Sequence, residues 1–266
     1  MTTLSVPAGI EIRGLRLLNL ALDEAVAAIE SAVLSRTPTR VAFVNADCVN
    51  IAARNPAYRD SLAGMDWVFV DGIGMRLAGR LLKQPVRDNV NGTDLFPLLC
   101  AALAAHGRSL YLLGGRPGVA EAAAHWAGAN YPGLRIAGAR DGYFPEADSH
   151  RVAATVRDSG ADVLLVAMGV PLQESWIARH GESAGATVTL GVGGLFDYYS
   201  GRIPRAPAWM RRTGLEWLFR LVQEPRRLWR RYLLGNVVFL ARIASDRLVR
   251  RASNPGQRVG AIREES

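Results

Sequence analysis

The sequence predicts a Rossmann-like α/β fold, a parallel sheet with helices on both faces, followed by a basic amphipathic helical appendage. Short apolar runs recur through the first 200 residues, longer segments with a helical pattern separate them, and glycine-rich turns follow most of the runs. Strands that are covered on both faces need such continuous apolar runs, and parallel strands need helical crossovers. We expect residues 1–200 to form one α/β domain, residues 201–251 the appendage, and residues 252–266 a disordered tail.

The candidate strands follow one another at regular intervals. They are residues 41–44, 67–70, 110–113, 163–166 and 188–190. The first dozen residues read as an initial strand, because no basic segment precedes an apolar run as it would in a secretion signal. Cys48 and Cys100 lie in apolar surroundings without metal-ligand spacing, which is typical of reduced core cysteines.

Ligands of parallel sheets bind beyond the carboxyl ends of the strands, so the residues after each run are candidate site residues. In chain order these are Asn45, Asp71, Gly114 and Gly115, Gln173 and Glu174, and Gly193 with Asp197. Glycine-rich exits place backbone amides and helix N-termini around one crevice, which suits an anion such as a diphosphate. Glycines at strand ends are also ordinary turn formers. Neither GxGxxG nor the P-loop pattern is present, so NAD and P-loop ATP chemistry are unsupported.

Asp71 is the sharpest candidate for catalysis. It ends an apolar run and precedes Gly72, so its carboxylate should sit at the rim of the crevice, where it could act as a general base. The alternative is a cap on the following helix. Asp94 is better suited to a helix start. Gln173 and Glu174 could hold a hydroxylated ligand, or Glu174 could only complement a helix dipole.

Candidate metal ligands are missing from the pattern. The sequence has no Asp-x-Asp, and its four histidines are scattered, so we predict neither a metal site nor another cofactor. Arginine would then have to neutralise a bound diphosphate, because guanidinium groups bind phosphate bidentately. The dense supply of arginine is in the appendage, which suggests that the appendage also completes the active site.

The appendage accounts for the basicity of the chain. Residues 202–251 carry thirteen arginines and three acidic residues, a net charge of +10, whereas the whole chain has +8. Large apolar residues alternate with these arginines, as in helices that lie at lipid headgroups. A solvated or oligomer-packing face and a nucleic-acid site are the alternatives, but the aliphatic run at 233–243 adds nothing to nucleic-acid binding. Residues 232–244 are too short to span a bilayer.

Several longer motifs include these candidate residues: VDGIG at 70–74, NVNGTDL at 89–95, MGVPLQESW at 168–176, GVGGLFD at 191–197, and EWLFRL and EPRRLWRRY in the appendage. In these motifs the chain shows a resemblance to the WecG/TagA/CpsF family, family 26 of the glycosyltransferases. It implies an inverting, metal-independent transfer of N-acetylmannosamine, its uronic acid or glucose from a UDP-sugar to a polyprenyl-diphosphate-linked sugar. Asp71 would be the base, and the enzyme would serve bacterial surface polysaccharide synthesis as a peripheral protein at the cytoplasmic face of the plasma membrane.

Two groups of arginines then have separate expected roles. Pro225 can start a new helix, which would place Arg226, Arg227, Arg230 and Arg231 with Trp229 at an anionic membrane surface. Arg205, Arg212 and Arg220 lie closer in sequence to the turn at 191–197, and we expect one or more of them at the donor diphosphate. We expect no nucleic-acid partner, and homo-oligomer formation stays open.

The chain departs from the family pattern at two positions. Phe43 stands where the family often has threonine, and Asn89 stands where an arginine commonly precedes the Val-x-Gly-x-Asp block. Both departures bear on which sugar or acceptor is used. The alternatives to a transferase are an enzyme that modifies nucleotide sugars and a membrane-docked nucleotide-sugar sensor.

Overall fold

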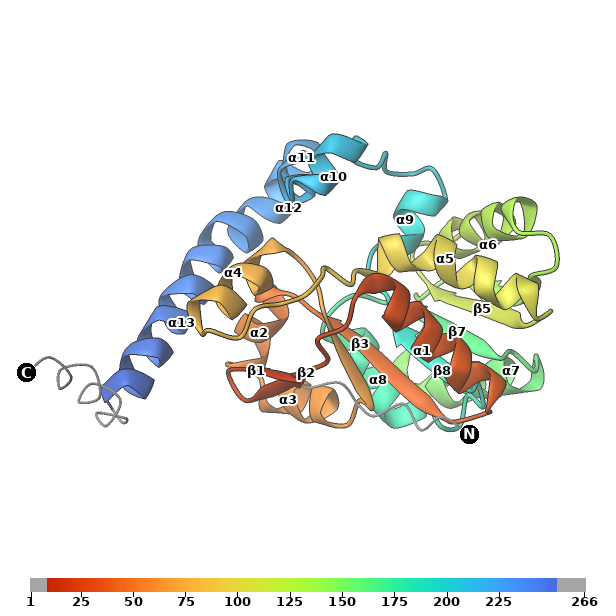
Figure 1. The fold of residues 1–266 in the computed structure, drawn as a ribbon. Helices are drawn as coiled ribbons and strands as arrows, with labels where there is room; N and C mark the ends of the chain where they lie inside the picture. The colour runs from red at the N-terminus through yellow and green to blue at the C-terminus, as the bar shows by residue number, and fades with distance from the viewer. Residues whose placement is uncertain (1–8, 253–266) are drawn as a thin grey trace, which may run out of the picture.

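A six-stranded parallel sheet forms the centre of the protein (Figure 1). The structure is a computed structural model that describes residues 9–252, without the side chains of Arg212, Arg227 and residues 248–252. The strand order is β4-β3-β8-β7-β5-β6. The strands are β3 (Thr39–Val44), β4 (Trp67–Val70), β5 (Ser109–Gly114), β6 (Arg135–Arg140), β7 (Val163–Ala167) and β8 (Val188–Gly191). The predicted Rossmann-like α/β fold is therefore confirmed, and each of the five apolar runs is a strand of this sheet.

β6 is the strand that the apolar runs did not predict. It lies at the edge of the sheet beside β5, and all of its residues are exposed or half-buried. An edge strand has one free side and needs no continuous apolar sequence. With Arg135 and Arg140 at its ends, β6 has no apolar run by which the sequence would predict it.

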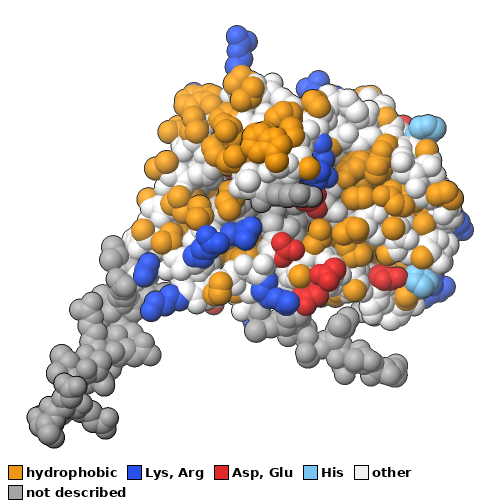
Figure 2. Space-filling model, turned by 45° about the horizontal axis from the view of Figure 1, so that its top comes forward, with side chains coloured by type: hydrophobic (Ala, Val, Ile, Leu, Met, Phe, Trp, Pro, Cys, Tyr) orange, Lys and Arg blue, Asp and Glu red, His pale blue; other side chains and the backbone are white. Residues whose placement is uncertain are grey.

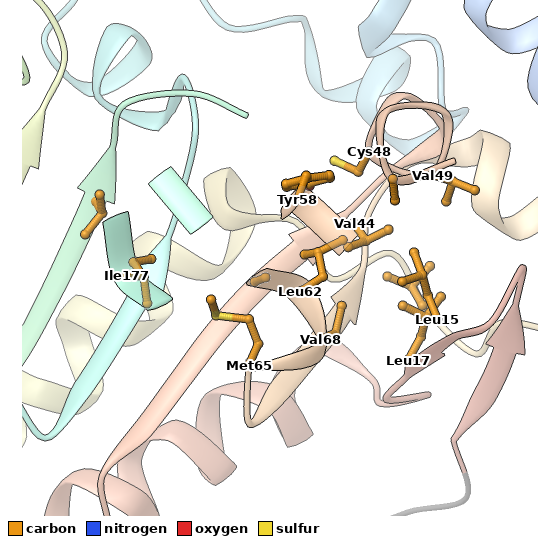
Figure 3. Packing of buried hydrophobic residues seen from close by; sticks show 14 of the residues in the cluster. Leu15, Leu17, Val44, Cys48, Val49, Tyr58, Leu62, Met65, Val68 and Ile177 are labelled. Atoms are coloured by element: carbon orange, nitrogen blue, oxygen red, sulfur yellow. The ribbon is translucent and has the colours of Figure 1, made fainter. Parts of the chain in front are cut away.

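Helices cover both faces of the sheet and bury two separate apolar clusters. One cluster holds α1 (Leu22–Leu34), α5 (Gly92–Ala105) and α6 (Val119–Asn130) against the sheet. The other holds α2 (Ala46–Ala52), α3 (Pro56–Ala63), α4 (Ile73–Leu81), α7 (Ser149–Asp158) and α8 (Leu172–His180). Figure 3 shows part of this second cluster, where Tyr58 and Leu62 of α3 lie beside Val44 and Val68 of the sheet.

A short antiparallel hairpin precedes the sheet. Its strands β1 (Ile10–Ile12) and β2 (Leu15–Leu17) pair through a two-residue turn. Arg13 and Gly14 both have positive φ angles, 53° and 75°, as a type I′ hairpin turn requires. Ile12 and Leu17 are fully buried and β2 contacts β4, so the hairpin adds to the apolar core at that strand.

The appendage is a run of helices that returns along the molecule. It consists of α10 (Ala208–Arg212), α11 (Glu216–Gln223), α12 (Pro225–Trp229), a π-helical segment η2 (Arg230–Leu234) and α13 (Gly235–Ala252). Figure 1 shows it passing above the sheet from α9 (Leu195–Tyr199) and then descending as the long α13. Its α12 starts at Pro225 as predicted, because proline fits the first turn of a helix.

The end of the appendage is anchored in the core. Phe239 and Ile243 of α13 are fully buried in the cluster that α2 and α4 share. Asn50 of α2 donates to the Gly235 carbonyl over 2.8 Å, and Arg242 donates to the Asn50 side chain over 3.0 Å. Within residues 9–252 no helix is both long and apolar enough to cross a membrane. Of the predicted disordered tail at 252–266, Ala252 is the last residue of α13, and residues 253–266 lie outside the described residues.

Candidate active site

A cavity of about 1180 Å³ lies at the carboxyl ends of the strands. The turns after β3, β4, β5, β7 and β8 form its floor, and side chains of α11 and η2 form part of its wall. The predicted site residues that line it are Asn45, Asp71, Gly115, Gln173, Gly193, Asp197 and Arg220. Gly114, Glu174, Asp94 and Arg205 are not among the lining residues, and the side chain of Arg212 is not described.

Asp71 follows β4 directly and lines the cavity. Its backbone N–H donates to the Val44 carbonyl over 2.9 Å, which continues the pairing with β3. Helix α4 has Gly72 as its N-cap, with a φ of 91° and no side-chain cap. The carboxylate of Asp71 is therefore not engaged as a helix cap in this structure.

Burial raises the pKa of the Asp71 carboxyl to about 6. A hydrogen bond from Asn45 and the positive charges of Arg231 and Arg220 act in the opposite direction, whereas the charge of Glu216 raises the pKa further. A carboxylate with this pKa is ionised at neutral pH and more basic than an ordinary aspartate. These are the properties that a general base requires.

Asn45 fixes the turn between β3 and α2. Its Oδ1 accepts from the backbone N–H groups of Asp47 and Cys48 over 3.0 and 3.2 Å, so Asn45 is the N-cap of α2. Opposite it, Asn89 Oδ1 accepts from the Gly72 N–H over 2.5 Å. Asn89 thus holds the backbone N–H of the residue that follows Asp71, Asn45 holds the start of α2, and both also line the cavity.

The glycines at the strand exits have different tasks. Gly114 has a φ of 137°, and a Cβ there would lie 2.4 Å from the Ala167 carbonyl, so this glycine permits close packing of β5 on β7. Gly193 has a φ of 57° with open space where a Cβ would be. Gly115 and Gly193 also line the cavity, but their backbone N–H groups are engaged within the protein: Gly115 donates to the Ala167 carbonyl and Gly193 to Gln173 Oε1, each over 2.9 Å. Gly114 supports the sheet.

Gln173 and Glu174 lie at the start of α8 and point inward. Gln173 is 2% exposed and reaches the cavity wall, and Glu174 is fully buried. Of the two residues, only Gln173 lines the cavity, so only Gln173 could contact a ligand there. The last member of the strand-exit set, Asp197 of α9, lines the cavity and accepts from Arg202 over 2.5 Å.

Asp94 and Arg205 form an ion pair behind the cavity wall. The guanidinium of Arg205 donates to Asp94 over 2.5 Å, and Arg211 approaches the same oxygen at 3.4 Å. Glu216 lies 3.7 Å from Arg205 on the other side. Two appendage arginines are thus matched by two carboxylates, and Asp94, which also accepts from Asn91 at the start of α5, joins the appendage to the α/β domain.

Arg220 is the appendage arginine best placed for an anion. Its guanidinium lies 5.2 Å from the Tyr198 ring centroid, and one of its nitrogens lies 3.4 Å from the place of a Cβ on Gly194. Its Nε is buried and has no hydrogen-bond partner within the described part of the chain. A cation with a spare donor therefore stands beside the glycine turn that follows β8.

The arginines that follow Pro225 diverge. Arg226 and Arg230 are exposed, and Arg230 stacks over the Trp229 ring at 5.3 Å. Arg231 instead lines the cavity, where its Nε lies 3.0 Å from Asp47 Oδ2. This placement differs from the membrane contact expected for Arg231. The side chain of Arg227 is not described.

Sequence reasoning missed several residues of the cavity wall, among them Tyr198, Arg202, Arg211 and Glu216. Tyr198 and Arg202 lie close to the recognised turn at 191–197, so their proximity was a usable signal. Arg211 and Glu216 had no such signal, because they reach the cavity only when the appendage folds over it. In residues 9–252 no group of three His, Cys, Asp or Glu side chains is arranged to hold a metal ion.

Comparisons with known proteins agree with these features. The model of the family described as "Glycosyl transferase WecG/TagA/CpsF family" matches residues 10–253. A relative from Bacillus subtilis is 32% identical over 193 residues, which cover 73% of this chain and 74% of the relative. One from Bacillus spizizenii is 34% identical over 182 residues, 68% of this chain and 70% of the relative. Both bear the name N-acetylglucosaminyldiphosphoundecaprenol N-acetyl-beta-D-mannosaminyltransferase.

Proposed function

The chain belongs to the WecG/TagA/CpsF family of glycosyltransferases, and from this we propose that it transfers a sugar from a UDP-sugar to a polyprenyl-diphosphate-linked acceptor with inversion and without a metal ion. Asp71 carries the proposal, because it faces a cavity that also holds Arg220 and the open glycine turn at Gly193. A base and a cation are two elements that such a transfer requires. The relatives' names favour N-acetylmannosamine as the sugar and an N-acetylglucosaminyl diphosphate lipid as the acceptor.

In the proposed reaction, an acceptor hydroxyl attacks C1 of the donor sugar from the face opposite the UDP group. Asp71 takes the hydroxyl proton as the new C–O bond forms. The bond between C1 and the diphosphate oxygen breaks, and its electron pair leaves with UDP. One displacement of this kind inverts the configuration at C1.

The leaving diphosphate needs positive charge where its own charge develops. Arg220 supports this role through its buried, unpartnered Nε and its position beside Gly194. We assign Arg205 a supporting part instead, since Asp94 and Glu216 hold its guanidinium outside the cavity lining.

We further propose that the appendage rests on a membrane surface that carries the lipid acceptor. Figure 2 shows hydrophobic side chains gathered in a broad patch on the appendage side of the molecule. Trp209 is 61% exposed, Val222 73%, and Val237 68%. Exposed patches of this kind mark membrane or protein contacts, and the exposed Arg226 and Arg230 of the same appendage suit anionic headgroups.

Release of UDP tests this function directly. Purified protein is incubated with each candidate UDP-sugar, with and without a polyprenyl-diphosphate N-acetylglucosamine, and the free UDP and the lipid product are measured. We expect acceptor-dependent UDP release and a disaccharide lipid of inverted configuration. UDP-sugar converted without an acceptor would instead indicate a nucleotide-sugar-modifying enzyme, and binding without any turnover would indicate a sensor.

A further inference from the structure

The Gln173 carboxamide joins two turns of the cavity floor. Its Oε1 accepts from the Gly169 N–H over 3.2 Å and from the Gly193 N–H over 2.9 Å. Gly169 follows β7 and Gly193 follows β8, which are neighbouring strands. One buried oxygen therefore sets the separation of two turns whose backbone faces the cavity.

Glu174 determines which end of this carboxamide faces the turns. Gln173 Nε2 donates to Glu174 Oε1 over 2.8 Å. The oxygen and nitrogen ends of a carboxamide have nearly the same size, but only the oxygen accepts from a backbone N–H. A carboxylate is purely an acceptor, so Glu174 draws the nitrogen toward itself and turns the oxygen toward Gly169 and Gly193.

Burying the Glu174 carboxylate costs free energy of folding, which its hydrogen bond to Gln173 offsets only in part. The side chain is fully buried, and its Oε2 has no hydrogen-bond partner among the described residues. No lysine or arginine in that part of the chain forms an ion pair with it. Burial raises the pKa of the Glu174 carboxyl to about 7, which reflects the cost of a charge in the interior.

We propose that Glu174 is a positioning residue: through Gln173 it holds the turns at Gly169 and Gly193 at the spacing that receives the donor nucleotide. This inference rests on the proposed UDP-sugar transferase function. Glu174 does not line the cavity, so it acts on the donor through Gln173 and not by contact.

Three variants separate this role from the alternatives. Glu174→Met keeps the length of the side chain and removes the acceptor. Glu174→Gln keeps an acceptor oxygen and removes the charge. Glu182→Met is the matched control on an exposed residue beyond the same helix. Glu174→Asp, which shortens the side chain and withdraws the carboxylate from Gln173, gives the same test if Glu174→Met does not fold.

Hydrogen exchange of the Gly169 and Gly193 amides is measured first, without nucleotide. We expect faster exchange at both amides in Glu174→Met than in wild type, Glu174→Gln or Glu182→Met. Unchanged exchange at both amides would overturn the proposal. Because this measurement needs no ligand, it decides the positioning role even if wild-type protein fails to bind UDP and the proposed function falls.

UDP affinity and turnover are measured next. We expect Glu174→Met to raise the UDP Kd about 10- to 100-fold, because binding must then order two turns that Gln173 no longer holds. Glu174→Gln should stay within about threefold of wild type. In a Gln173→Met background, Glu174→Met should add almost nothing, since both changes break one linkage. Additive effects, or a Glu174→Gln variant that keeps its UDP Kd but loses turnover, would contradict action through Gln173.

Discussion

At the scale of single residues, the chemistry of the cavity depends on how Asp71 is surrounded. Burial is the dominant influence on its carboxyl, and the Asn45 hydrogen bond and Arg231 partly offset it. With a pKa of about 6, the Asp71 carboxyl is ionised near neutral pH. It forms no ion pair with a cation among the described residues. A directly paired aspartate would be a weaker base, because an adjacent cation lowers the pKa.

Replacing Asp71 with asparagine should abolish most turnover and leave binding intact. Asn has nearly the same shape but cannot take a proton, and a positioned base contributes about 10²- to 10⁴-fold to the rate. We expect kcat to fall by that factor while the UDP Kd stays within a few-fold of wild type, measured by UDP release and by calorimetry. An Asp71→Asn enzyme with wild-type kcat would exclude this residue as the base.

The pH dependence of turnover should report the raised pKa of Asp71. A base works when deprotonated, so kcat/KM should be level above pH about 6 and fall about tenfold per pH unit below it. Arg231→Gln removes a charge that lowers this pKa, so the acidic limb should move to higher pH. Arg230→Gln, an exposed neighbour, is the control that should not move it. A limb near pH 4 in wild type would show that Asp71 titrates as an ordinary aspartate.

At the scale of elements, the π-helical segment after α12 directs two adjacent arginines, Arg230 and Arg231, to different surfaces. Successive residues of a helix point in different directions, so Arg230 stacks on the exposed Trp229 while Arg231 meets Asp47 in the cavity. π-helical turns occur often at functional sites. One short element thus presents arginine to both of the surfaces that the proposed reaction joins.

Arg230 and Arg231 should accordingly fail in different assays. A cation near an anionic membrane contributes about 1 kcal/mol, so Arg226→Gln with Arg230→Gln should weaken binding to anionic vesicles roughly 30-fold. That double variant should keep its turnover on a water-soluble acceptor analogue. Arg231→Gln should bind vesicles nearly as wild type and lose turnover on the same analogue. The opposite pattern would place Arg231 at the membrane and Arg230 in the site.

At the scale of the whole molecule, the appendage closes a cavity that the α/β domain leaves open on one side. The domain supplies Asp71 and the glycine turns, and the appendage supplies Arg220, Arg231 and Glu216. Asp94 holds Arg205 and Arg211, and the core holds Phe239 and Ile243. Both ends of the appendage are therefore fixed to the domain on which it acts.

Turnover should survive removal of divalent metal ions. The proposed site neutralises the leaving diphosphate with arginine, so chelation has no charge to remove. We expect the rate of UDP release in excess EDTA to equal the rate with magnesium or manganese. A loss on chelation that either ion restores would show that the diphosphate is bound by other partners than those proposed.

The sequence by itself determined the sheet, the position of Asp71 and the basic appendage. These are local properties, because a strand buried on both faces must be continuously apolar. The residue that ends such a strand must lie at the carboxyl end of the sheet, where ligands bind. The sequence did not predict the edge strand β6, because its exposed residues carry no such pattern.

Only the tertiary structure decided where the appendage side chains go. Arg205 meets Asp94 across 111 positions of sequence, and Arg231 meets Asp47 from the opposite end of the chain. From the sequence we expected Arg205 at the donor diphosphate and Arg231 at a membrane surface. Their partners depend on how the appendage folds back over the sheet, and no local pattern encodes that geometry. The same holds for Glu174, whose burial follows from the packing of α8 on α3 and the sheet rather than from its place in the motif.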